Sequence, residues 1–311
     1  MLQRWKVKDL TALSEFGFEE DKKSKKTVSE LENSTVVEDS KPKNEELKVV
    51  ANTDATANND INSYFIDALI TDVSEDLAAK YGYDKEAAER LFYSGGYNIY
   101  ATVDTKMQAI AEKAYINIAD SAKKSSKGDP LWGAMTIMNY KGQVKALVGG
   151  IGEKTTNRGF NRATMAVRQP GSTMKPIAAY AQAMEKNIIT YSSVVNDVRK
   201  KFGGWAPNNW YGGNKGYITA HFALEYSVNT IPTYLVNEIK PQVSYDFLKN
   251  TLGCTSLTKA DANLSPLGMG GTNGGITTLE SAAAFAIFGN GGLYYEPTLY
   301  TKVLNQKGEE I

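Results

Sequence analysis

The order of hydrophobic repeats after residue 60 is the feature that most restricts the fold of this 311-residue chain. Phe65, Leu69, Val73 and Leu77 recur every four residues and predict one amphipathic helix. Short β-type runs follow in GAMTIMN and QVKALVGG, joined by a hairpin turn at 140–142. Several helical patterns come next, and the strand-like run PTLYTKVLN returns near the C-terminus. Strands, then helices, then a returning strand predict an α+β fold, with an antiparallel sheet flanked by helices.

Caps and turns predict the remaining elements. Asp84 and Asp104 precede helical patterns as N-caps, and Gly82 ends the helix before Asp84. In the helix after Asp104, these apolar residues fall on one face: Met107, Ile110, Ala111, Ala114, Tyr115 and Ile118. The run YNIYATV predicts a strand. Further helices are expected for IAAYAQAMEKN and for these ranges: 219–226, 229–239, 242–252 and 277–288.

The composition changes near residue 60. Of the first 60 residues 23 are charged, and aliphatic residues are too sparse to offset the entropy of ordering the chain. The sequence therefore predicts a disordered charged linker over 1–60, with room for a short helix near 5–17. We expect a linker region of helices and a strand over 61–130, and the main domain over 131–311.

Charge and residue counts exclude several classes of function. Lys and Arg together number 35, as do Asp and Glu, so the formal net charge is zero. No Gly-rich phosphate loop and no basic-aromatic stripe occurs, so nucleic acid is not an expected partner. Cys254 is the only cysteine and is expected to be a buried apolar residue. His221 is the only histidine, expected at a helix surface or in packing, so neither a zinc site nor a serine-protease triad is predicted. We predict no metal and no cofactor.

The stretch RQPGSTMKP raises the question of an activated serine. Ser-x-x-Lys occurs four times in the chain, at Ser40, Ser121, Ser172 and Ser256, so the spacing alone carries little information. Only Ser172 lies at a junction between a strand-and-loop segment and a well-patterned buried helix. There a free helix N-terminus can stabilise an oxyanion, and a desolvated Lys175 can take the serine proton as a neutral amine. The alternative, equally open on this context, is that Ser172 only caps the helix.

A second motif favours catalysis. Ser227-Val228-Asn229 is the only Ser-x-Asn in the chain and lies between two apolar helices. A hydroxyl at this place can relay a proton, and a carboxamide can both donate to and accept from a substrate amide. The competing interpretation is a polar corner between helices, since Ser and Asn favour turns.

Together these residues resemble the penicillin-binding proteins, the serine D,D-transpeptidases that cross-link bacterial peptidoglycan. The similarity to the class A enzymes covers about residues 61–311 in order. It includes YSGGYNIYATVDTKMQ, FNRATMAVRQPGSTMKPIAAYAQAME, WAPNNWYGGNKGYITAHFALEYSVNTIP and SPLGMGGTNGGITTLESAAAFAIFGNGG. The resemblance implies a penicillin-binding/β-lactamase-like transpeptidase fold for the domain at 131–311.

The resemblance also assigns roles to individual residues. Ser172 would be the acylated nucleophile, Lys175 its general base and Ser227 a proton relay, while Asn229 would hold the donor peptide. Trp210 and Tyr211, with Trp205, would line the substrate cleft, although packing is the commoner role of such aromatic residues. Peptidoglycan stem peptides and β-lactam antibiotics would be the ligands, and other proteins of cell-wall synthesis would be partners.

The chain departs from the family pattern in several ways. No Lys-Thr-Gly or Lys-Ser-Gly follows GNGG before Ile311, so we expect a transpeptidase domain that is incomplete at its C-terminus. The chain has no apolar run of about 20 residues and no apolar signal-peptide core in MLQRWKVKDL. Family resemblance nevertheless implies the extracytoplasmic face of the bacterial cell membrane. A β-lactamase-like hydrolase and a non-catalytic peptidoglycan- or penicillin-binding relic are the alternatives, although no convincing Glu is present as a hydrolytic base.

Overall fold

A computed structural model gives the fold of most of the chain. The structure describes the following residues: 61–119, 122, 126, 128 and 131–311. The predicted charged linker over 1–60 and the helix near 5–17 therefore lie outside the described residues.

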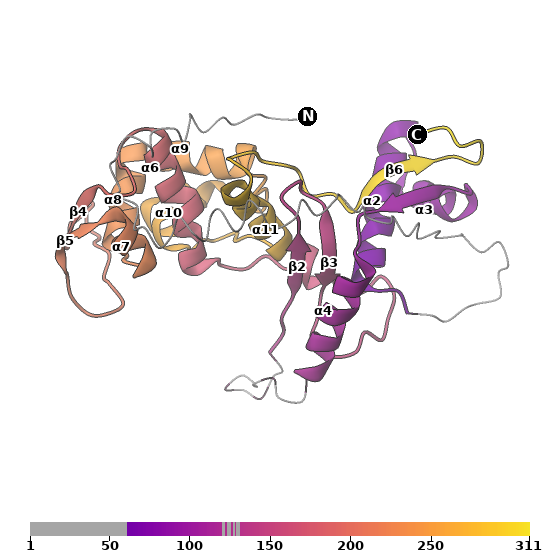
Figure 1. Ribbon diagram of the computed structural model, residues 1–311, viewed down its shortest axis with the longest axis horizontal. Helices are drawn as coiled ribbons and strands as arrows, with labels where there is room; N and C mark the ends of the chain where they lie inside the picture. Colours follow the sequence, from indigo (N-terminus) through magenta and orange to yellow (C-terminus); the bar gives the residue numbers. More distant parts are fainter. Residues whose placement is uncertain (1–60, 120–121, 123–125, 127, 129–130) are drawn as a thin grey trace, which may run out of the picture.

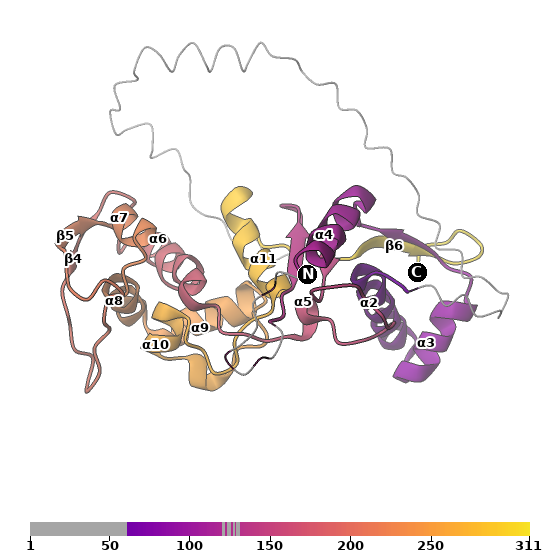
Figure 2. The same ribbon diagram turned by 90° about the horizontal axis from the view of Figure 1, so that it is seen from below.

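The first part of the described chain forms one end of the molecule (Figures 1 and 2). Helix α2 (Tyr64–Tyr81) buries the predicted stripe, since Phe65, Leu69, Val73 and Leu77 are all at most 3% exposed. The helix ends at Gly82, as predicted, and α3 (Lys85–Ser94) begins behind the Asp84 cap. Helices α2 and α3 pack against each other, next to strand β1 (Asn98–Ala101).

The C-terminal strand returns to this same end of the molecule. Strand β6 (Tyr300–Leu304) pairs antiparallel with β1, and Ile99 lies opposite Val303 with both side chains buried. A strand from the end of the described chain thus completes the apolar cluster that α2 begins. Figure 1 shows β6 in yellow beside the indigo α2.

A hairpin and a helix lie between the two ends of the molecule (Figures 1 and 2). Strands β2 (Met135–Met138) and β3 (Val144–Val148) pair antiparallel around the predicted turn. Helix α4 (Thr105–Asn117) begins at the Asp104 cap, as predicted, and packs on β3 through Ala111. The expected apolar face of α4 is wrong in part, because Met107 and Ile110 are 44% and 70% exposed and Gln108 is buried instead. The Gln108 side chain exchanges hydrogen bonds with the backbone of Leu147, which makes a polar residue the better partner for β3.

Helices make up most of the other end of the molecule. Strands β4 (Val194–Asp197) and β5 (Gly216–Thr219) pair antiparallel at its edge and were missed in the sequence. The helical elements after β3 are the following: α5 (Arg162–Met165), η2 (Gly171–Thr173), η3 (Pro176–Tyr180), α6 (Ala181–Glu185), α7 (Ala220–Glu225), α8 (Thr230–Ile239), α9 (Pro241–Asp246), η4 (Phe247–Thr251), η5 (Lys259–Asp261), α10 (Leu264–Met269), α11 (Thr278–Ala286) and η6 (Ile287–Gly289).

The α+β class is confirmed by this arrangement. The described strands form three two-stranded antiparallel sheets where the sequence suggested one sheet. The largest apolar cluster extends from Met174 to Ile287 and is built mostly by helices, among them α8. Among the described residues no helix combines the length and the apolar character that a membrane crossing needs.

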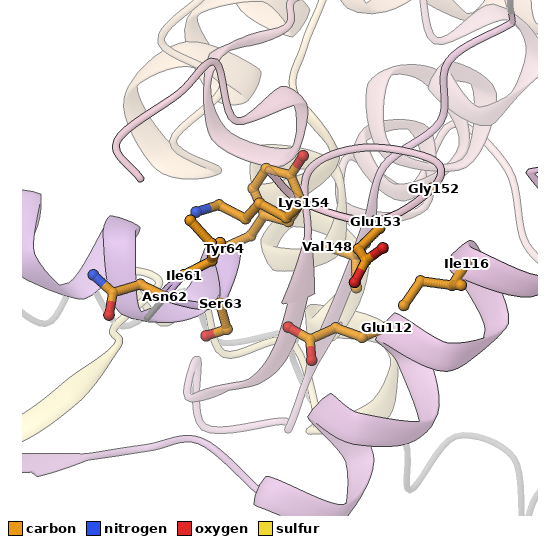
Figure 3. Close-up of a pocket in the computed structure, with 10 residues that line it drawn as sticks. All are labelled: Ile61, Asn62, Ser63, Tyr64, Glu112, Ile116, Val148, Gly152, Glu153 and Lys154. Carbon is orange, nitrogen blue, oxygen red and sulfur yellow. The ribbon is translucent and has the colours of Figure 1, made fainter. Parts of the chain in front are cut away.

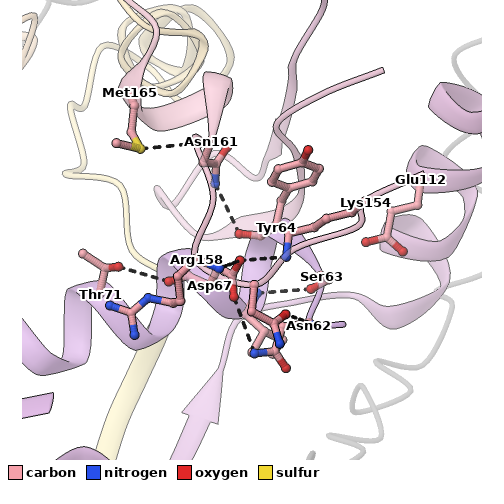
Figure 4. Close-up of polar contacts among 12 residues, drawn as sticks. Asn62, Ser63, Tyr64, Asp67, Thr71, Glu112, Lys154, Arg158, Asn161 and Met165 are labelled. Carbon is pink, nitrogen blue, oxygen red and sulfur yellow. Dashed lines mark hydrogen bonds and ion pairs between the residues drawn. The ribbon is translucent and has the colours of Figure 1, made fainter. Parts of the chain in front are cut away.

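A buried ion pair fixes α2 to the loop after β3 (Figure 4). Lys154 Nζ lies 2.8 Å from Asp67 Oδ2, and the two side chains are only 11% and 6% exposed. The backbone N–H of Arg158 donates to the same carboxylate oxygen at 2.7 Å. The Asn161 carboxamide also donates to the carbonyl of Tyr64, at 3.3 Å. These polar contacts, with the Lys154 and Asp67 side chains almost excluded from solvent, hold α2 against the loop after β3.

Candidate active site

The candidate nucleophile lies at the start of the largest apolar cluster. Ser172 occupies the single 3₁₀ turn η2, and its side chain is exposed, whereas Met174 and Lys175 behind it are buried. The Ser172 hydroxyl has no hydrogen-bond partner among the described residues, and neither η2 nor η3 has a side-chain cap. The capping interpretation of Ser172 therefore finds no support in the structure, which leaves the hydroxyl open to solvent.

Lys175 has its ammonium group buried without a carboxylate partner. The residue is 1% exposed, and Nζ donates to Ser227 O at 2.8 Å, Ser227 Oγ at 3.0 Å and Asn229 Oδ1 at 2.6 Å. Burial lowers the pKa of Lys175 to about 8, because leaving water penalises the charged form. The ammonium therefore satisfies its three donors, and close to neutral pH it can still lose a proton.

The sequence expectation for this turn is met only in part. Ser172 and Lys175 are one turn apart, yet the structure places no hydrogen bond between them, since Lys175 is directed at the second motif. Directly after Lys175 comes the π-helical turn η3, which opens with Pro176. Such turns are frequent at functional sites because they widen the helix and redirect side chains.

The second motif forms a strained corner between α7 and α8. Ser227 has a backbone φ of +52°, which an L-residue with a Cβ adopts at a cost of about 1–3 kcal/mol. This conformation turns both its carbonyl and its hydroxyl toward Lys175. Asn229 follows as the residue before α8, and its carboxamide accepts from Lys175 while donating to Asn208 O at 2.7 Å. The polar corner foreseen in the sequence is thus used to hold the lysine.

A glycine-rich loop makes hydrogen bonds to the segment that leads into Ser172. Gly171 N donates to Gly270 O at 3.2 Å, and Arg168 exchanges two backbone hydrogen bonds with Ile276. Gln169 adds a side-chain bond to Thr272 O at 3.0 Å. The segment before Ser172 is therefore fixed by a loop about 100 residues further along the chain, which the motif spacing around Ser172 does not identify.

The two aromatic candidates differ in their surroundings. Tyr211 is half-buried, packs on the largest cluster and donates its hydroxyl to Asp197 Oδ2 at 2.6 Å. Trp210 is 65% exposed, although its indole N–H donates to Tyr226 O at 3.0 Å, directly before Ser227. Trp210 thus presents a largely exposed ring beside the second motif, with the rings of Tyr211 and Tyr226 packed against it, while the hydroxyl of Tyr211 is bonded to Asp197. Trp205 is 36% exposed and pairs through its backbone with Phe202.

A cavity of about 390 Å³ lies away from these residues (Figure 3). It is lined by residues 61–64, Glu112, Ile116 and Val148 together with Gly152–Lys154, and it contains none of the predicted site residues. Within the described part of the chain, no group of three or more His, Cys, Asp or Glu side chains is placed to hold a metal ion.

The one cysteine and the one histidine of the chain lie in the surroundings that the sequence predicted for them. Cys254 is fully buried, and burial, followed by the charge of Glu280, raises its pKa to about 12. His221 is on the surface of α7, where its side chain is half exposed and stacks on Tyr191.

Comparison with known proteins identifies the family. The sequence model described as "Penicillin binding protein transpeptidase domain" matches residues 133–310. This match covers more than half of the chain, so the chain belongs to the penicillin-binding protein transpeptidase family. The resemblance noted from the motifs is thereby confirmed, while the boundaries 61–130 and 131–311 and the roles of single residues stay predictions.

Individual relatives agree with this assignment. The chain is 30% identical over 269 residues to penicillin-binding protein 1A of Clostridium acetobutylicum, covering 80% of this chain and 32% of the relative. Penicillin-binding protein 1F of Bacillus subtilis is 33% identical over 243 residues, covering 76% and 32%. The chain thus spans about a third of the length of these curated relatives.

Solved structures show the same fold. The PonA1 protein of Mycobacterium tuberculosis in complex with penicillin V superposes with a TM-score of 0.63 at 23% identity, covering 79% of this chain and 64% of that chain. Penicillin-binding protein 1A of Haemophilus influenzae gives a TM-score of 0.61 at 21% identity, covering 80% and 49%.

Proposed function

We propose that this chain carries the acylation site of a serine D,D-transpeptidase that cross-links peptidoglycan. The observation that carries the proposal is the buried Lys175 ammonium, held by Ser227 and Asn229 one helical turn from the unbonded hydroxyl of Ser172. Burial without an ion-pair partner makes the charged form of a lysine costly, so Lys175 lowers the stability of the fold. Such a cost is typical of residues that take part in catalysis.

The chemistry follows from these groups. The Ser172 oxygen attacks the carbonyl carbon of a D-Ala-D-Ala peptide bond as neutral Lys175 takes the hydroxyl proton. The carbon–nitrogen bond then breaks, the leaving D-Ala amine receives a proton through Ser227, and an acyl-serine ester remains. The amine of a second stem peptide attacks the ester carbon, the bond from this carbon to the Ser172 oxygen breaks, and the proton lost by the amine passes to the Ser172 oxygen, which restores the hydroxyl. The ester conserves the energy of the broken peptide bond, so no nucleotide is consumed.

Substrate contacts are proposed for two further residues. Asn229 already uses its carboxamide as both donor and acceptor, so a stem-peptide amide would replace the Asn208 contact or share it. The exposed ring of Trp210 would pack against the peptide, whereas Tyr211 would support the cleft wall from within. These assignments fit a site on the extracytoplasmic face of the membrane, where stem peptides and β-lactams are found.

A fluorescent penicillin tests this proposal on the purified 311-residue chain. We expect a covalent adduct that mass spectrometry locates on Ser172, and loss of the adduct in Ser172→Ala. A chain that melts cooperatively and forms no adduct would refute the proposal. Rapid nitrocefin turnover would instead indicate a hydrolase, and peptidoglycan binding by Ser172→Ala without acylation of the parent would indicate a binding role.

A further inference from the structure

Asp197, at the end of β4, is a fully buried carboxylate that the site described so far does not use. Its Oδ1 accepts from Thr230 Oγ1 at 2.6 Å and from the carboxamides of Asn209 and Asn214 at 2.9 and 3.0 Å. Its Oδ2 accepts from Tyr211 OH at 2.6 Å and from the backbone N–H of Lys215 at 2.7 Å. Five donors therefore converge on one carboxylate.

These donors keep Asp197 ionised. Burial alone would raise its pKa, but the hydrogen bonds from Thr230, Tyr211, Asn214 and Asn209 outweigh burial and hold the pKa below the usual range of an aspartate. A charged acceptor makes each of these bonds stronger than a bond between neutral groups. Asp197 thus fixes the segment 209–215 to the first residue of α8.

Asn209 transmits this order to the catalytic motif. Its Nδ2 donates to Asp197 and to Gly213 O, so its Oδ1 faces the start of α8. There it accepts the backbone N–H of Asn229 at 2.9 Å and that of Thr230 at 3.4 Å. Helix starts normally use the side chain of the preceding residue as a cap. Here Asn229 precedes α8 and makes no side-chain cap bond, and Asn209 accepts the backbone N–H groups of Asn229 itself and of the first helical residue, Thr230.

The oxygen of the Asn229 carboxamide accepts from the lysine and not from the backbone of α8. An asparagine that capped its own helix would direct Oδ1 at the backbone, whereas Asn229 Oδ1 lies 2.6 Å from Lys175 Nζ. The order of contacts runs from Asp197 to Asn209, from Asn209 to the backbone of Asn229, and from the Asn229 side chain to Lys175.

We propose that Asp197 is a positioning residue that acts through Asn209, and that this pair holds the backbone of Asn229 so that its carboxamide stays on Lys175. This inference rests on the function proposed above, since it assigns Lys175 as the base of that reaction. Asp197 touches no reacting group. We therefore expect it to affect the rate constant of acylation, through the position of Asn229 and Lys175, and not the binding of the acyl donor.

The variants Asp197→Asn and Asn209→Ala test the two links. An amide at 197 turns one acceptor atom into a donor, which then faces N–H or O–H groups that also donate. Ala at 209 removes the acceptor at the start of α8 and leaves Asp197 in place. Asp67→Asn is the matched control, because Asp67 is a similarly buried carboxylate on α2, outside the site.

Two measurements on the full chain distinguish positioning from general stability. Hydrogen exchange should accelerate about tenfold or more at the amides of Asn229 and Thr230 in both variants, and stay slow at Leu235 and Val236 in the same helix. The first-order rate constant of penicillin acylation should fall about 100-fold, with the dissociation constant of the noncovalent complex unchanged. Asp67→Asn should change neither quantity.

The outcomes separate this inference from the proposed function. Unchanged exchange at 229 and 230 in Asn209→Ala, or an equal loss of protection throughout α8, would overturn the inference whether or not penicillin reacts. Selective acceleration of hydrogen exchange at these two amides, without any acylation of the parent chain, would support the positioning of the Asn229 backbone by Asn209 and refute the proposed function instead. Acylation of both variants at the parental rate would overturn the positioning role.

Discussion

Gly270 lies directly against Gly171, the residue before the candidate nucleophile. The Gly171 N–H donates to Gly270 O, and a Cβ on Gly270 would come within 1.9 Å of Gly171 O. Gly270 also has a φ of +77°, where a side chain adds backbone strain. Two independent constraints thus require glycine at this position, and the steric one involves the turn that carries Ser172.

Gly270→Ala should therefore displace the nucleophile turn. We expect acylation of Ser172 by penicillin to fall about 100-fold, because a shift near 1 Å has that effect on a positioned nucleophile. Gly271→Ala is the control, since a Cβ there meets no atom within 4 Å. Stopped-flow acylation of the two variants makes the comparison, and equal rates would contradict this role of Gly270.

Two substitutions at Ser227 can separate the effect of backbone strain on stability from the effect of the hydroxyl on acylation. Ser227→Ala and Ser227→Gly both remove the hydroxyl that accepts from Lys175, so both should lose acylation to a similar extent. Only glycine adopts a φ of +52° without strain. We therefore expect Ser227→Gly to be the more stable of the two by about 1 kcal/mol in urea unfolding. An alanine variant as stable as the glycine variant would show that the corner can relax.

Local patterns in the sequence were sufficient for elements that depend on neighbouring residues. Caps such as Asp84 and Asp104, and the four-residue stripe of α2, act over one or two turns, and the structure confirms them. The α4 face was misjudged because Gln108 is buried by a partner strand that periodicity does not identify.

The supports of the candidate site were missed for a related reason. Asn209, which donates to Asp197, contacts the backbone of Asn229, and Gly270 contacts Gly171 from about 100 residues further along the chain; no local pattern marks these residues. Motif spacing located the polar groups, but their directions depend on the fold: Lys175 points to the second motif and makes no hydrogen bond with Ser172.

The ion pair of Asp67 and Lys154 should dominate the stability of the interface around α2. Lys154→Met leaves a buried carboxylate without its countercharge, a change that costs about 3–5 kcal/mol in comparable sites. Replacing both residues, as Asp67→Asn with Lys154→Met, should cost clearly less than the sum of the single changes. Urea unfolding of the four proteins gives the coupling energy.

An exposed pair in the same region is the control for this cycle. Glu86 and Arg90 lie 3.8 Å apart on α3 with side chains 88% and 71% exposed, so Glu86→Gln should change stability little. Additive effects of the Asp67 and Lys154 changes would contradict a coupled pair.

The pKa of Lys175 predicts how stability depends on pH. The folded chain releases this proton near pH 8, whereas the unfolded chain holds it up to about 10.5. Between these values the unfolded state binds more protons, so the free energy of unfolding rises with pH, by at most about 3 kcal/mol across the window. Below pH 8 both states are protonated and the contribution is flat.

In Lys175→Met this dependence is absent while all other titrating groups remain. The difference in unfolding free energy between the parent and Lys175→Met, measured in urea from pH 7 to pH 10, should therefore move in favour of the parent as the pH rises. A constant difference over that range would mean that water reaches the ammonium, and that Lys175 cannot act as a neutral base near pH 8.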